Sequence, residues 1–256
     1  MTNITATQVK ALRDRTGVSM MECKKALTEA GGDEEKAIEV LRKRGAAKAA
    51  KKAGRETSEG VIVTKVEGDK AVIVQLNCET DFVAKNEAFV ALANKGADLA
   101  LEKGVEAAKA EVEPELKALF TKLGENMSIE MDVIGGEGLA EYVHGNGKMG
   151  AIVNLKSADA EKARDVAMHI TAMNPAVIQP EELPEDLVIK EREIWKTQLL
   201  HEGKPEEMID KIMMGKEKKF RAEQALVKQA FVKDGGMTVE EYLEGNTVEN
   251  FVRRGV

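Results

Sequence analysis

The stretch GVIVTKVEGDKAVIVQLNC, residues 60–78, decides the fold of this chain. Two runs rich in Val and Ile flank the polar segment EGDK, which is the pattern of a β-hairpin. A helix rich in Ala and Leu follows, to about Gly104. The same order returns in AEYVHGNGKMGAIVNL, residues 140–155, and ADAEKARDVAMHITAMNP, residues 158–175. The repetition predicts an α+β fold with two related antiparallel sheets, each with helices on one face.

The first 45 residues carry three helix signals in succession. Thr5 with Gln8 and Ser19 with Glu22 form capping-box patterns, and Asp33 is placed to cap a third helix. Glycines are expected to end these helices, at Gly17, Gly31 and Gly45. A bundle this short buries little apolar surface, and we therefore expect it to be stabilised by packing against the rest of the chain or against a partner.

A basic segment follows the three helices. Seven basic residues and no acidic one lie between Arg42 and Arg55. We interpret residues 46–60 as a solvated linker or a frayed helix. The alternative is a contact with RNA, which is less favoured because no aromatic side chain lies among the charges to stack on bases.

Residues 184–231 predict a different unit, an antiparallel helical hairpin of coiled-coil type. The predicted turn of the chain is GKP at 203–205. Apolar residues at spacings near three, four or seven lie on both expected helices: Leu187, Ile194 and Leu199 on the first, and Met208, Ile212, Phe220 and Leu226 on the return helix. The hairpin could be a lever, a dimerisation arm that makes a homodimer, or a structural insertion. The expected division is a three-helix module at 1–45, a linker at 46–60, one core subdomain at 61–140, a second at 141–183 and 232–256, and the hairpin between its two parts.

Composition limits the function classes. The chain has 38 basic and 45 acidic residues and a net charge of -7, so we do not expect a dedicated nucleic-acid binder. Two cysteines without CxxC spacing and three histidines argue against a zinc site and for a reducing compartment. No secretion signal precedes the first helix, and no apolar run approaches the ~20 residues that span a bilayer. We therefore expect a cytoplasmic protein without membrane contact.

The string GNGKMG, residues 145–150, matches the glycine pattern of dinucleotide-binding turns. That site needs a helix after the glycines, whereas the strand-like AIVNL follows here, so we interpret the string as a hairpin turn. GxSxG, P-loop and HExxH patterns are absent. We therefore do not expect an enzyme, although an α+β enzyme with a deep polar pocket is the third class to test.

The segment NCETDFVAKN, residues 77–86, raises a question about Phe82. The apolar stripe of the following helix, which includes Phe89 and Leu92, is interrupted by Lys85 and Asn86 before it reaches Phe82. Phe82 is therefore either core at the edge of a loop or a contact for another protein, because an exposed Phe has a cost unless a partner covers it.

Thr80 or Asp81 is a candidate cap for the same helix. Met20 and Met21 pose a similar question, since they precede the apolar stripe of the second helix and thioethers suit a partner surface as well as a core. Two sites with apolar side chains outside a core stripe, at Phe82 and at Met20 and Met21, favour a protein-binding function.

The sequence closely resembles the bacterial translation elongation factor Ts family. LRDRTGVSMMECKKAL, residues 12–27, and LNCETDFVAKN, residues 76–86, are similar to its two signatures, and the resemblance extends from Ile4 to about Val252. It implies a three-helix UBA-like module, a core of two α+β subdomains and an inserted helical hairpin. Gln75 departs from the Glu of many members, and some members continue beyond a strand like FVRRGV into a helical module. If the natural protein also ends at Val256, we expect affinity to rest more on the N-terminal module and the core.

The resemblance implies a guanine-nucleotide exchange factor for elongation factor Tu. In that mechanism Asp81 and Phe82 intrude beside the magnesium site of the GTPase and weaken its hold on GDP. The Mg²⁺ belongs to the partner, so no cofactor and no metal is expected in this chain. The positions that match partner contacts are Thr80, Asp81, Phe82 and Val83 in the motif, Arg13, Met20 and Met21 in the N-terminal module, and His144 and Gly145 in a core turn. The alternative, a ribosome- or RNA-associated accessory protein that uses the basic segment, predicts binding that falls steeply with salt and ignores Phe82.

Overall fold

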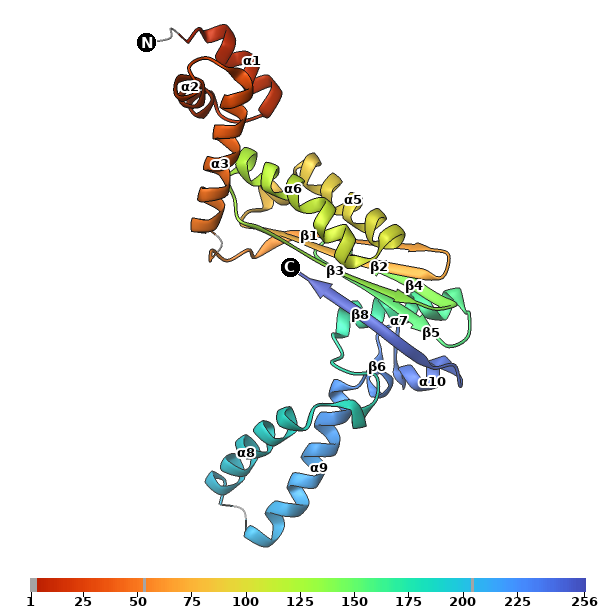
Figure 1. The fold of residues 1–256 in the computed structure, drawn as a ribbon. Coiled ribbons are helices and arrows are strands. Elements are labelled where there is room, and N and C mark those ends of the chain that lie inside the picture. The colour runs from red at the N-terminus through yellow and green to blue at the C-terminus, as the bar shows by residue number, and fades with distance from the viewer. Residues whose placement is uncertain (1–3, 53, 204) are drawn as a thin grey trace.

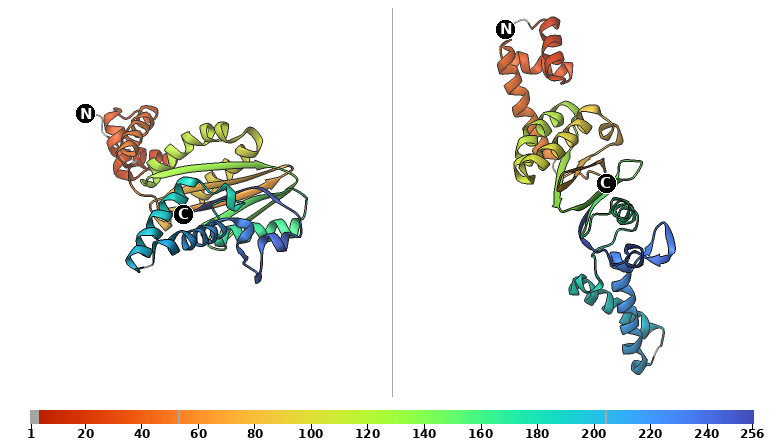
Figure 2. Two further views of the ribbon diagram at one scale, coloured as in Figure 1. Left: turned by 90° about the horizontal axis from the view of Figure 1, so that it is seen from below. Right: turned by 90° about the vertical axis from the view of Figure 1, so that its right-hand side faces the viewer.

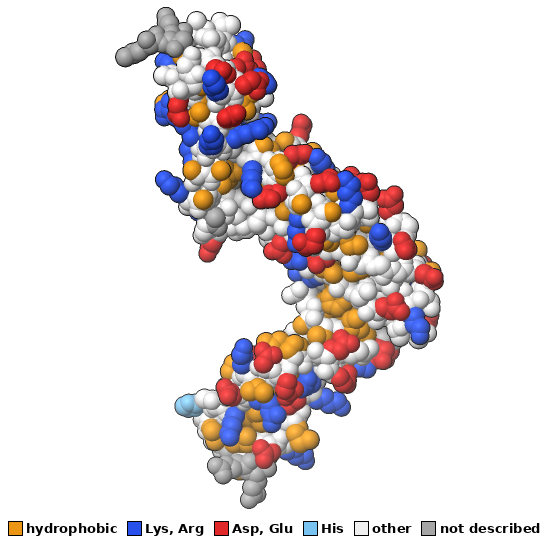
Figure 3. Space-filling model, viewed as in Figure 1, with side chains coloured by type: hydrophobic (Ala, Val, Ile, Leu, Met, Phe, Trp, Pro, Cys, Tyr) orange, Lys and Arg blue, Asp and Glu red, His pale blue; other side chains and the backbone are white. Residues whose placement is uncertain are grey.

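The computed structural model describes residues 4–52, 54–203 and 205–256. It is elongated and curved, with helices α1 to α3 at one end, two sheets and their helices in the middle, and α8 and α9 at the other end (Figure 1). The space-filling view shows a hollow on one side of this crescent (Figure 3). Among the described residues no helix is long and apolar enough to cross a membrane.

Helices α1 (Ala6–Thr16), α2 (Met20–Glu29) and α3 (Glu34–Lys52) pack around a small apolar core. The expected caps are confirmed at Thr5, whose side chain completes a capping box, and at Ser19 and Asp33, which accept from backbone N–H groups three residues on. Leu12 and Leu27 are almost fully buried in this core. The three-helix module therefore has its own core.

The expected end of the third helix at Gly45 is wrong. α3 runs through Gly45 to Lys52, because Gly45 is buried where α3 crosses α6 (Val105–Leu123). A Cβ at position 45 would lie 2.1 Å from Thr121 Oγ1. The glycine therefore permits close helix packing, and the predicted linker at 46–60 is helical up to Lys52. Its residue 53 lies outside the described residues.

Two three-stranded antiparallel sheets form the middle of the molecule. β2 lies at the centre of the first and β5 at the centre of the second. The predicted hairpins are confirmed, and the tight turn between β1 and β2 uses Gly68 at a φ of 60°. The strands of the first sheet are β1 (Glu59–Glu67), β2 (Lys70–Cys78) and β3 (Met127–Gly135), and those of the second are β4 (Gly138–Val143), β5 (Met149–Leu155) and β8 (Val248–Gly255).

The two sheets pack face to face and carry helices on their outer faces (Figure 2). α5 (Glu87–Lys103) and α6 cover the first sheet, and α7 (Ala160–Met173) covers the second. α10 (Val239–Leu243) packs against α7 and adds Val239 and Leu243 to the same core. Ile73 and Ile152, both fully buried, lie between the sheets. β2 is nearly continuously apolar because both of its faces are buried.

The chain leaves the second sheet through α8 (Glu185–His201) and α9 (Glu206–Gln224), which pack against each other. Leu199, Ile209 and Met213 are buried between them, and Trp195 meets Phe220 edge to face. The predicted apolar stripe is correct in part. Leu199, Ile212 and Phe220 lie in the contact between α8 and α9. Leu187, Ile194 and Met208 are exposed instead, and Leu226 belongs to the core of the second sheet. Lys204, in the predicted turn, lies outside the described residues.

Short elements complete the second half of the chain. The strands β6 and β7 pair with each other, and the short helix η2 contributes Leu226 to the core below the second sheet. Their bounds are η1 (Pro180–Glu182), η2 (Leu226–Lys228), β6 (Ala230–Phe231) and β7 (Asp234–Thr238).

Candidate partner-binding surface

Phe82 lies on α4 (Asp81–Ala84), a single helical turn between β2 and α5. Its side chain is 82 % exposed, while its neighbour Val83 is buried in the core of the first sheet. Of the two interpretations left open by the sequence, the structure excludes core packing for Phe82. Phe82 is therefore available to a partner, and large aromatic side chains are frequent anchors at the centre of protein interfaces.

The base of α4 is fixed by the carboxylate of Glu125, which follows α6. Glu125 accepts hydrogen bonds from the Glu79 N–H at 3.1 Å, from the Thr80 N–H at 3.0 Å and from the Thr80 hydroxyl at 2.6 Å. Thr80 occupies the N-cap position of α4, but its side chain makes no capping bond because Glu125 engages it. The expectation that Thr80 or Asp81 caps the helix that carries Phe89 is wrong, because that helix, α5, begins at Glu87 and the Asn86 side chain caps it by accepting from the Ala88 N–H at 3.0 Å.

Glu79 ties the same corner together from the other side. Its carboxylate accepts from the Asn126 N–H at 2.7 Å and pairs with Arg55 at 3.2 Å. The hydrogen bond from Asn126, followed by the Arg55 pair, lowers the pKa of Glu79. Residues that are far apart in sequence thus hold α4 in one place.

Asp81 faces positive charge. Its carboxylate pairs with Lys85 at 2.7 Å, and this hydrogen bond, with a smaller contribution from Lys148, lowers its pKa. Lys148 itself pairs with Glu59 at 2.6 Å. The β4–β5 turn that carries Lys148 therefore lies close to α4.

The β4–β5 turn exposes His144 and Gly145. The Gly147 carbonyl accepts from the Ile62 N–H at 2.8 Å, and the Lys148 carbonyl accepts from the Val256 N–H at 2.9 Å. The turn is thus attached to both sheets and lies beside Val256, which faces the hollow of the crescent (Figure 1). Since β5 follows the glycines, the hairpin interpretation of GNGKMG is confirmed.

Arg13, Met20 and Met21 lie elsewhere, in the three-helix module at one end of the molecule (Figure 1). All three are exposed, Met21 by 69 %. The structure therefore brings α4 and the β4–β5 turn together but leaves the module as a second, separate surface.

The family model described as Elongation factor TS matches residues 79–256. Elongation factor Ts of Pasteurella multocida is 48 % identical over 259 residues, which cover 99 % of this chain and 92 % of that protein. Elongation factor Ts of Tolumonas auensis is 46 % identical over 266 residues, with 99 % and 91 % covered. That of Psychromonas ingrahamii is 46 % identical over 262 residues, with 98 % and 89 % covered. This chain belongs to the elongation factor Ts family.

For this elongation factor Ts family member, sequence reasoning missed the residues that hold the surface in place. These residues are Glu125, Asn126 and Lys148, and each contacts a residue more than 40 positions away in the sequence. Only the αL glycine at 124, which ends α6, pointed to a change of chain direction there. The amide of Gln75, the departure from the family pattern, donates to the Asn77 side chain at 3.0 Å and to the Gly255 carbonyl at 3.1 Å.

Proposed function

We propose that this protein is a guanine-nucleotide exchange factor for elongation factor Tu in translation elongation. It binds the GDP form of the GTPase, places Asp81 and Phe82 beside the magnesium site and promotes GDP release. The observation that carries the proposal is Phe82, exposed by 82 % on a helix whose base is fixed by Glu125. Membership of the elongation factor Ts family supports it.

The free energy gained when a partner covers Phe82 is comparable to the coupling free energy that nucleotide exchange requires. Covering a Phe side chain is worth about 1.5–3 kcal/mol relative to leaving it in water. Coupling between two binding sites is typically about 1–3 kcal/mol. Part of the burial energy of Phe82 can therefore be used to displace groups around Mg²⁺. Because α4 is held in the free protein, little is lost in ordering it on binding.

The rest of the surface supplies affinity. Thr80 and Val83 hold α4 to the core, and His144 and Gly145 extend the contact surface from the neighbouring turn. We infer that α1 to α3 are a UBA-like module whose Arg13, Met20 and Met21 press on a second part of the GTPase. Thioethers adapt to a partner surface at low cost.

Exchange of this kind needs no catalytic acid, base or nucleophile in the factor. The protein shifts a binding equilibrium of its partner, and no bond is made or broken by its own side chains. We accordingly propose a cytoplasmic non-enzyme without a cofactor. We also propose that α8 and α9 form an antiparallel hairpin that is available for a homodimer contact.

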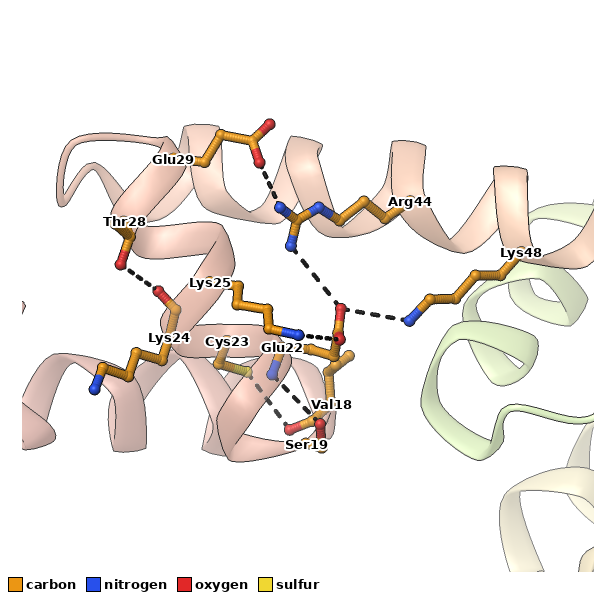
Figure 4. Close-up of polar contacts among 10 residues, drawn as sticks. All are labelled: Val18, Ser19, Glu22, Cys23, Lys24, Lys25, Thr28, Glu29, Arg44 and Lys48. Atoms are coloured by element: carbon orange, nitrogen blue, oxygen red, sulfur yellow. Dashed lines mark hydrogen bonds and ion pairs between the residues drawn. The ribbon is translucent and has the colours of Figure 1, made fainter.

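The RNA-binding alternative is weakened by the basic segment itself. Of its seven basic residues, Arg44 and Lys48 pair with acidic residues of α2, and Arg55 pairs with Glu79. Figure 4 shows Glu22 surrounded by Lys25, Arg44 and Lys48. Charges that are neutralised within the chain contribute less to counterion release from a phosphate backbone.

Release of fluorescent GDP from elongation factor Tu tests the proposal. We expect the wild-type protein to accelerate release manyfold and Phe82→Ala to remove most of that acceleration. Met214→Ala is the matched control, because Met214 is 74 % exposed but lies on α9. No acceleration by the wild type would refute exchange. Equal acceleration by Phe82→Ala would keep exchange and move its cause to Asp81 or to the N-terminal module.

A further inference from the structure

The three-helix module rests on the C-terminal end of α6. Gly45 of α3 packs on Thr121, and a Cβ at Gly17 would lie 2.8 Å from the side chain of Lys122. Val18 and Leu41 line a cavity of about 370 Å³ together with Phe120, beside the same crossing. The Lys122 side chain can move away from Gly17, so it is the close packing of Gly45 on Thr121 that limits sliding of the module along α6.

The same end of α6 continues directly into the residues that hold α4. Lys52, at the end of α3, donates to the Gly124 carbonyl. Glu125 then accepts the three hydrogen bonds from Glu79 and Thr80, and the Asn126 side chain donates to the Arg55 carbonyl at 2.9 Å. The consecutive residues 120–126 therefore contact both the module and the base of α4.

From this arrangement we propose that residues 120–126, named here the α6 anchor, fix the separation between the exposed methionines of the module and Phe82. The proposal rests on the proposed function and adds to it which residues set the geometry of the two contacts. Gly45 and Thr121 are positioning residues that touch no nucleotide. When two contacts are held at the spacing the partner requires, the second forms at a high effective concentration after the first.

Changes on the module side of the α6 anchor should affect GDP release differently from changes on the α4 side. A displaced module weakens association but leaves Phe82 seated by Glu125. Loosening at Gly45 should therefore raise the factor concentration needed for half-maximal GDP release and leave the limiting release rate intact.

Gly45→Ala is a sharp probe because helix propensity alone favours it. The added Cβ would meet Thr121 Oγ1 at 2.1 Å, and the Thr121 Cβ and Cγ2 each at 3.1 Å. Rotation of Thr121 about χ1 would move its Oγ1 but would leave its Cβ 3.1 Å from the added Cβ, and it would break the hydrogen bond from the hydroxyl to the Lys117 carbonyl at 3.0 Å. The helices must therefore move apart, and the module moves with α3.

Two further variants isolate this effect. Gly215→Ala is the matched control, because Gly215 lies within α9 and a Cβ added there would meet none of the described residues packed around that helix within 4 Å. The double variant Gly45→Ala/Thr121→Ala removes the hydroxyl and methyl groups that the new Cβ meets, so it should restore most of the native spacing. Thermal unfolding followed by circular dichroism verifies that each variant is folded.

The test is GDP release from elongation factor Tu measured across a range of factor concentrations. We expect Gly45→Ala to raise the half-saturating concentration at least fivefold with a limiting rate within twofold of wild type. Gly215→Ala should match wild type, and the double variant should recover to within about twofold of it. An unchanged half-saturating concentration, an equal loss in the limiting rate, or no recovery in the double variant would overturn the α6 anchor. Inactivity of the wild type would instead refute exchange itself.

Discussion

Replacement of Glu125 by Ala tests how firmly α4 is held. The carboxylate accepts three hydrogen bonds, at 3.1, 3.0 and 2.6 Å, from Glu79 and Thr80. Since these groups are half-buried, water can replace part of each bond, and we assign about 0.5–1.5 kcal/mol to each. The variant should therefore lose about 1.5–4.5 kcal/mol of local stability, which is about a 10- to 2,000-fold increase in opening of this corner.

Amide hydrogen exchange followed by NMR measures that opening directly. The amides of Glu79 and Thr80 donate to Glu125 in the wild type, so both should exchange faster in Glu125→Ala by the stated factor. Glu125→Gln is the conservative control. It keeps one acceptor oxygen, and its amide can donate to the Thr80 hydroxyl, so the loss should be about 1 kcal/mol.

The same variants should change GDP release in a defined way. With α4 loosened, Phe82 is seated for a smaller fraction of the time, and the limiting release rate falls more in Glu125→Ala than in Glu125→Gln. If Glu79 and Thr80 keep wild-type exchange rates in Glu125→Ala, Glu125 does not hold α4, and the reasoning from these hydrogen bonds fails.

Two further predictions concern the core. Phe89→Ala should lower the free energy of unfolding in urea by about 3–5 kcal/mol, because Phe89 is fully buried against the first sheet; a loss below about 1 kcal/mol would contradict that packing. Burial lowers the pKa of His169 below its usual 6.5, so its neutral form stabilises the fold above that pH and the contribution is lost as the pH falls. Urea unfolding between pH 7 and pH 5 should therefore show a steeper loss for wild type than for His169→Gln, and parallel curves would exclude this role.

The sequence predicted the features that depend on neighbouring residues. The caps at Thr5 and Asp33 and the turn at Gly68 are local, since each bond or φ angle involves residues within a few positions. The buried stripe of α5, including Phe89 and Leu92, follows from helical periodicity. The exposure of Phe82 also had a local signal, the interruption of that stripe at Lys85 and Asn86.

The features that the sequence did not predict depend on distant contacts. Glycine is typical of the end of a helix, and only the packing of Gly45 on Thr121 explains why α3 continues past it. Thr80 has the position of a cap, but Glu125 competes for its hydroxyl. We also did not predict α6 or β3 from the sequence. MSIEMDV, residues 127–133, nevertheless alternates apolar and polar side chains, as a strand with one buried face does.

The most direct test of the proposed exchange mechanism is the affinity of the protein for elongation factor Tu with and without bound GDP, measured for wild type and for Phe82→Ala. By linkage, the factor by which GDP weakens binding of the protein equals the factor by which the protein weakens GDP. We predict a large factor for wild type and one close to unity for Phe82→Ala. If Phe82→Ala discriminates between the two forms as strongly as wild type, Phe82 does not couple the two sites and the account is wrong.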